Sequence, residues 1–333
     1  MSLFGAQFNE PEWMLQPLGD ISHTILAGRG RQMLERLAEA GVPLPLDHRL
    51  AQAIRYLDVP EDGAPTASET ERATRMAAAT GALLEALAIV EAHRASRSQR
   101  HLFTLERLRQ LCQGRLVTLT GTHDDDANRR FETYVAALLL MGGFTIYDAE
   151  PDWHVLYAHG ERLGLAVKRI NRASERAIRD RVQEAEIQIA RAKVRGVIVV
   201  NVDAMTADLA PGLPPEEFGP AFDAAAAHVL SRVGALADRA HVVGAYLFGS
   251  GMQLRFAEDG VASLHMAVVH KILPLCDDAE LPTFGPFLER MQLKVRLALQ
   301  GITRLASPDS GGTTGLPHLD GPSLRSSGER KAE

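Results

Sequence analysis

The stretch Gly196–Val202 (GVIVVNV) constrains the fold of this chain most, because a nearly continuous apolar run of strand length suits a strand buried on both faces. An amphipathic helix is predicted directly before it, over Ser174–Lys193, with an apolar stripe from Ile178 to Ala192. A helix that leads into a buried strand is typical of a crossover in an α/β sheet.

The elements around this run extend the same pattern over residues 116–303. The apolar spacing predicts further helices at Arg129–Met141, Phe218–Ala240 and Thr283–Gly301. Strands are predicted at Phe144–Tyr147, Val242–Phe248 and Ser263–Val269, with a hairpin formed by His154–Ala158 and Leu163–Ile170. We therefore expect one α/β domain over residues 116–303.

The flanking segments differ from this domain. Residues 1–115 have apolar residues at helical spacing, as in Arg31–Ala40 and Thr70–Ala95, and we expect an all-helical N-terminal domain. None of its residues suggests catalysis, so we assign it to packing, to homo-oligomer formation or to binding a protein partner. Residues 304–333 contain few large apolar residues, and we expect a disordered tail there.

Composition excludes several classes of protein. The longest apolar runs fall far short of the roughly 20 residues that span a bilayer, so we expect no membrane partner. The N-terminus lacks the pattern of a secretory signal, and the two cysteines, Cys112 and Cys276, form no disulfide framework, which favours the cytoplasm. The net charge of −6 argues against a protein that coats nucleic acid, although residues 160–195 carry ten basic and five acidic residues.

Four polar positions stand out within the predicted α/β elements. Glu132 lies on the first helix, Asp152 follows Pro151 at the start of a strand, and Gln188 lies on the helix before the buried strand. Lys168 lies in the apolar strand LGLAVKRI, where a charged side chain needs a partner. It is one of only five lysines among 36 basic residues, so lysine stands here although arginine is the usual cation of this chain.

This order of residues resembles the PD-(D/E)xK superfamily, which has the restriction-endonuclease-like fold. The resemblance covers residues 129–203 well and extends to about residue 270. It implies a mixed central sheet flanked by helices and a nuclease that uses Mg²⁺ or Mn²⁺. By the resemblance, Asp152 and Glu132 bind the metal, Lys168 assists the attacking water and the phosphate, and Gln188 positions a neighbouring group.

The sequence departs from the family pattern at Ala166, where the family has the acid of its D/E-x-K tripeptide. A methyl group cannot bind a metal ion. One interpretation is that another carboxylate replaces the acid, and the candidates are Glu184, Glu150, Glu161 and Glu175, with Glu184 first because it lies one turn before Gln188. The other interpretation is a catalytically inactive module of the same fold that binds nucleic acid or a protein partner.

A row of arginines follows the predicted site. Arg172, Arg176 and Arg179 share a helix face, Arg169 precedes them, and such a row suits the phosphates of nucleic acid. Glu175 and Asp180 interleave with the row, so ion pairing within the helix is the alternative. The leading hypothesis is a Mg²⁺- or Mn²⁺-dependent endonuclease that hydrolyses nucleic acid, with DNA as the first expected substrate.

The segment Phe248–Gly251 resembles the glycine-serine turn of nucleotidyltransferases. The aspartate pair that such a turn needs does not follow at the right spacing. We therefore expect an ordinary turn that ends the strand Val242–Phe248.

Overall fold

The computed structural model describes residues 16–58, 69–96, 98–116, 125–157, 160–170, 174–203, 215–256 and 262–306. The predicted tail from residue 307 onward lies outside the described residues. The last helix, α10 (Leu281–Leu305), extends past residue 303, where the tail was expected to begin.

In the described part of the chain, seven strands form one mixed sheet with the order β1-β7-β6-β5-β4-β3-β2. The strands are β1 (Gln16–Ile21), β2 (Ile146–Asp148), β3 (Trp153–Leu156), β4 (Arg162–Arg169), β5 (Gly196–Asn201), β6 (Val242–Phe256) and β7 (Ala262–Pro274). The α/β class and the mixed sheet therefore agree with the sequence analysis.

The central strands β4, β5 and β6 are parallel, and the outer pairs are antiparallel. The predicted hairpin forms between β3 and β4, where Trp153 pairs with Leu165. The apolar run forms β5, all of whose residues are buried. Helix α7 (Glu175–Ala192) connects β4 to β5, and the Ser174 side chain caps its N-terminus by accepting from the Ala177 amide.

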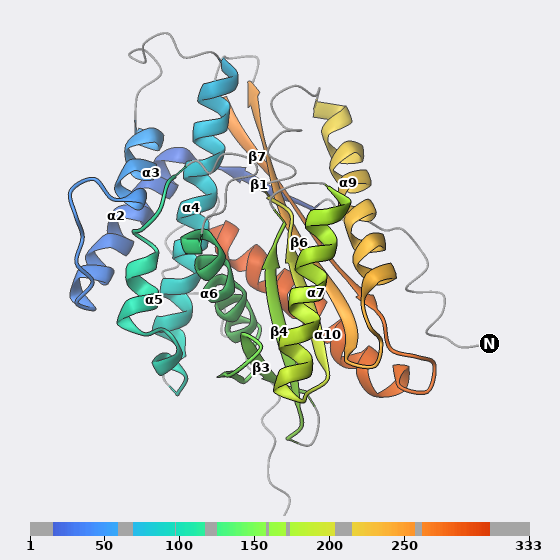
Figure 1. The fold of residues 1–333 in the computed structure, drawn as a ribbon. Helices are drawn as coiled ribbons and strands as arrows, with labels where there is room; N and C mark the ends of the chain where they lie inside the picture. The colour runs from blue at the N-terminus through green and yellow to red at the C-terminus, as the bar shows by residue number, and fades with distance from the viewer. Residues whose placement is uncertain are drawn as a thin grey trace, which may run out of the picture.

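Two helical layers cover the sheet (Figure 1). Helices α7 and α9 (Pro215–Leu236) pack on one face and bury a cluster that includes Ala166, Ile178 and Val200. Helix α6 (Asp125–Met141) and α10 pack on the other face, which contains Leu165 and Val167. Alternate residues of β4 therefore belong to different cores, as strand geometry requires.

The N-terminal helices lie outside α6. They are α2 (His23–Glu39), α3 (Arg49–Asp58), α4 (Glu69–Ala95) and α5 (Leu105–Gln110), with a short 3-10 helix at Arg100–Leu102. Helix α4 packs against α6, and one hydrophobic core joins these helices to the sheet. The segment Thr74–Ala95 of α4 is long and apolar enough to span a membrane by length and composition, and 72% of its most apolar window is buried inside the protein.

Two predictions about the backbone are wrong. The N-terminal region is not all-helical, because β1 pairs with the edge of β7 and so joins the sheet. The segment Phe248–Gly251 is not a turn, because β6 continues through it to Phe256 and pairs with β7 along its length. The glycines there are compatible with a strand because the ladder to β7 supplies the backbone hydrogen bonds that local sequence cannot indicate.

Candidate active site

The candidate site begins where β3 ends beside β4. Trp153 is the first residue of β3 that pairs with β4, so the amide of Val167 lies beyond the ladder. The Asp152 carboxylate replaces the missing strand as hydrogen-bond acceptor, and its Oδ2 accepts a hydrogen bond of 2.6 Å from the Val167 amide. This bond satisfies a donor at the open edge of β4 and fixes the carboxylate beside the strand.

Gly164 of β4 allows the segment before β3 to approach the strand closely. A Cβ atom on Gly164 would lie 2.9 Å from Cδ of Pro151 and 2.8 Å from a methyl group of Val194. Real Cβ atoms essentially never approach so closely, so the small residue on β4 lets the Pro151-Asp152 segment pack against the strand.

The structure places Lys168 between two carboxylates. Its Nζ atom lies 3.8 Å from Oδ2 of Asp152 and 3.6 Å from Oε1 of Glu184. The Lys168 side chain is only 7% exposed and that of Asp152 12%, whereas that of Glu184 is 46% exposed. A nearly buried ammonium group needs such partners, and here the segment before β3 and helix α7 supply them.

Burial and neighbouring charge raise the pKa of both carboxyl groups that the resemblance assigns to the metal. Burial raises the pKa of Glu132 to about 7, and Asp152 adds to the rise, while Lys168, Arg107 and Arg129 oppose it. Burial also raises the pKa of Asp152 to about 6, against the effects of Lys168 and of the hydrogen bond from Val167. Asp152 and Lys168 are therefore close enough to Glu132 to shift the pKa of its carboxyl group.

The remaining candidate acids have other partners or weaker links to the site. Glu161 accepts a hydrogen bond from the Tyr157 hydroxyl, and Glu175 pairs with Arg232. Glu150 contributes to the raised pKa of Asp152. Of the four candidates, Glu184 is the one that forms an ion pair with Lys168.

Gln188 lies one turn after Glu184 on α7. Its Oε1 atom is buried and has no hydrogen-bond partner within the described part of the chain. Ala166 is fully buried in the apolar cluster beneath α7, and its methyl side chain supplies no ligand at that position of β4. Across the described ranges, no group of three or more His, Cys, Asp or Glu side chains is arranged to hold a metal ion.

Two arginines of the predicted row form ion pairs with acidic residues of the same helix. Arg176 lies 3.7 Å from Asp180, and Arg179 lies 3.7 Å from Glu175. Both arginines are well exposed, at 92% and 61%. Arg169 is half-buried at the end of β4, and Arg172 lies outside the described residues.

Sequence reasoning assigned no role to two residues beside the site. The Trp153 indole donates a 3.0 Å hydrogen bond to the carbonyl of Glu132, which ties α6 to β3. Arg107 of α5 stacks 4.4 Å above the Trp153 ring and also binds Asp148. The position of Trp153 directly after Asp152 could have indicated its role beside the site. Nothing in the sequence around Arg107 indicates that this arginine reaches the site.

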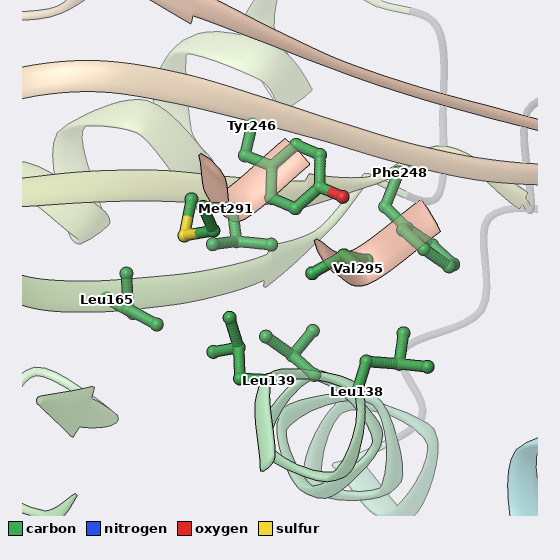
Figure 2. A pocket seen from close by; sticks show the side chains of 9 residues that line it. Leu138, Leu139, Leu165, Tyr246, Phe248, Met291 and Val295 are labelled. Carbon is green, nitrogen blue, oxygen red and sulfur yellow. The ribbon is translucent and has the colours of Figure 1, made fainter. Parts of the chain in front are cut away.

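An apolar cavity lies apart from this cluster (Figure 2). It is enclosed between α6, α10 and strands β4 to β6, and side chains such as Leu138, Tyr246 and Val295 surround it. Its volume of about 10 Å³ is close to that of a single water-sized sphere, and its lining offers a water no polar surface. We interpret it as a packing defect rather than a binding site.

The chain matches no protein-family model, no curated protein and no solved structure. Function must therefore be argued from the site itself.

Proposed function

We propose that this chain is a divalent-metal-dependent nuclease that hydrolyses phosphodiesters of nucleic acid, with DNA as the first substrate to test. The observation that carries the proposal is Lys168, a nearly buried ammonium held between the carboxylates of Asp152 and Glu184 at the open edge of β4. Such a group beside paired acids suits a reaction in which negative charge builds on a phosphate.

The side chains present suit Mg²⁺ or Mn²⁺. Mg²⁺ prefers oxygen ligands and is commonly held by one or two carboxylates, with waters and substrate phosphates completing its shell. Asp152 and Glu184 supply two carboxylates, Glu132 lies near them, and the unpaired Oε1 of Gln188 is a further oxygen on the same helix as Glu184. In this proposal Glu184 supplies the acid that Ala166 lacks.

Each residue then has a chemical role. A bound divalent ion would polarise the phosphate and lower the pKa of a bound water. Asp152 and Glu184 would hold that ion, and Lys168 would stabilise the charge that develops on the phosphate. Glu132, whose pKa is about 7, would accept a proton near neutral pH or donate a carboxylate oxygen to the ion. In this proposal the exposed arginines of α7, together with Arg169, contact the phosphate backbone of the nucleic acid.

The second candidate is an inactive module of the same fold that binds nucleic acid or a protein partner. The full burial of Ala166 among apolar side chains favours it, because the family's second ligand position on β4 is closed. The two candidates differ in whether Glu184 substitutes for that ligand.

The test is cleavage of labelled linear, circular and single-stranded DNA with Mg²⁺ or Mn²⁺. Wild type is compared with Lys168→Met and with the matched control Lys294→Met, which lies on α10 at the other face of the sheet. We expect Lys168→Met to lose about 100-fold or more of the cleavage rate, as for other groups that stabilise transition-state charge.

Lys294→Met is expected to cut like wild type. Equal cutting by wild type and Lys168→Met would contradict the proposed site. An inactive wild type with activity gained in Ala166→Glu would support the inactive module.

A further inference from the structure

Both carboxylate oxygens of Glu184 are engaged by cations. Oε1 lies 3.6 Å from Nζ of Lys168, and Oε2 accepts a 2.6 Å hydrogen bond from Nη1 of Arg181, one turn earlier on α7. In this arrangement the acid best placed to replace the missing ligand is already neutralised on both sides. A divalent ion must therefore compete with at least one of these two partners.

Arg181 can move away from Glu184 more easily than Lys168 can. Lys168 is 7% exposed and is also held by Asp152, so its ammonium remains in place when Glu184 moves. Arg181 is 26% exposed on the same helix as the other proposed nucleic-acid contacts. A guanidinium group binds a phosphate through two parallel hydrogen bonds, which makes a phosphodiester a strong competitor for Arg181.

We propose that Arg181 is a positioning residue that withholds Glu184 from the metal until a substrate phosphate draws its guanidinium away. This inference rests on the proposed function and names the regulation of that site. The exchange is balanced in charge, since the phosphate takes the positive partner of Glu184 and the freed carboxylate takes up part of the charge of the ion.

The exchange makes metal binding and phosphate binding favour each other. Coupling between two ligands is reciprocal, so each must strengthen the binding of the other by the same factor. Removing Arg181 should therefore have opposite effects on the two ligands. It should strengthen binding of the metal alone and weaken binding of nucleic acid alone.

The experiment measures Mn²⁺ affinity from the electron paramagnetic resonance signal of free Mn²⁺, without nucleic acid. The proteins are wild type, Arg181→Gln, Glu184→Gln, the double variant, and the matched control Arg191→Gln, which lies about two turns after Glu184 on α7. We expect Arg181→Gln to bind Mn²⁺ about threefold more tightly, a modest factor because an exposed ion pair is weak. The gain should vanish in the Glu184→Gln background and should be absent in Arg191→Gln.

A second arm measures binding of a fluorescein-labelled DNA duplex in EDTA by anisotropy at several salt concentrations. Arg181→Gln should weaken binding and lower the salt dependence by about one phosphate contact. Thermal unfolding shows that each variant is folded.

The outcomes separate the two proposals. Equal Mn²⁺ affinity of wild type and Arg181→Gln would overturn the inference even if wild type cuts DNA. Tighter Mn²⁺ binding with unchanged DNA binding would also overturn it, because Arg181 would then hold Glu184 without sensing phosphate. Wild type that neither binds Mn²⁺ nor cuts DNA would overturn the proposed function and the inference together.

Discussion

Two clusters of buried charged side chains differ in their ratio of cations to carboxylates. Among the N-terminal helices, Arg49 and Arg130 share Glu85, at 3.1 Å and 3.5 Å. At the candidate site, Lys168 is shared by Asp152 and Glu184. The first cluster joins α3, α4 and α6, and its three side chains are 7%, 3% and 20% exposed. The second has one acid that is nearly half exposed.

The difference indicates how a cluster that stabilises packing can be distinguished from the proposed active site. The helical cluster is largely buried, with Glu85 as its most exposed member at 20%, and its charges stabilise the packing of three helices. At the candidate site the Glu184 side chain is 46% exposed, and in our proposal this carboxylate binds a divalent cation from solution. Burial of charge alone would not separate the two, because both hold charged groups that are nearly inaccessible.

The largest expected effect is on stability in the helical cluster. Glu85→Gln removes the carboxylate from two buried arginines, which should lower the free energy of unfolding by about 3 kcal/mol. Urea denaturation measures this loss. The control Glu106→Gln breaks an exposed pair with Arg109 at 3.9 Å, and should change stability by less than about 0.5 kcal/mol. A loss below about 1 kcal/mol for Glu85→Gln would mean that the two arginines are solvated without it.

Glu184→Gln should show the reverse pattern. Its pairs are partly exposed, so the free energy of unfolding should change by less than about 1 kcal/mol. The DNA cleavage rate should fall about 100-fold, which corresponds to about 2.7 kcal/mol of barrier. The control Asp180→Asn removes another exposed acid of α7 and should leave cleavage within about twofold. Unchanged cleavage by Glu184→Gln would exclude it as the replacement ligand.

Glu132 allows the pH dependence of the site to be tested. Its pKa rises from 4.5 to about 7 in the folded protein. Between these values the folded state holds a proton that the unfolded state releases, so stability falls as pH rises through this window and is level above it.

Glu132→Gln stays neutral and should escape this loss. In EDTA it should be more stable than wild type at pH 8, by on the order of 2 kcal/mol, and about equal to it at pH 4. Urea denaturation across this range measures the difference, with Glu35→Gln as an exposed control. The same difference at pH 4 and pH 8 would show that Glu132 titrates normally.

The sequence predicts those elements of the sheet that have a local signal. Residues close together in the sequence determine the apolar run of β5, the periodic stripe of α7 and the hairpin of β3 and β4. β1 was missed since its place depends on pairing with β7, about 250 residues later. Local propensity cannot report such a partner.

The same reasoning applies to the site. Lys168 in an apolar strand predicts a buried charge that needs partners, and the spacing on α7 made Glu184 the first choice among the spare acids. Arg107 could not be predicted, because it approaches Glu132 only through the packing of α5 against α6. Sequence patterns thus identify site residues that lie on the strands and helices around the site. They miss residues, such as Arg107, that reach the site from another layer of helices.

The smallest expected effect tests whether the two clusters are independent, since α6 carries Arg130 of one and Glu132 of the other. Trp153→Phe removes the hydrogen bond to the carbonyl of Glu132 and should lower the free energy of unfolding by about 1 kcal/mol. Combined with Glu85→Gln, the two losses should add within about 0.5 kcal/mol, because the altered side chains share no partner. Urea denaturation of both single variants and the double variant measures this. A larger deviation would mean that α6 transmits strain from the closed cluster to the open one, so that the N-terminal helices help to set the position of Glu132.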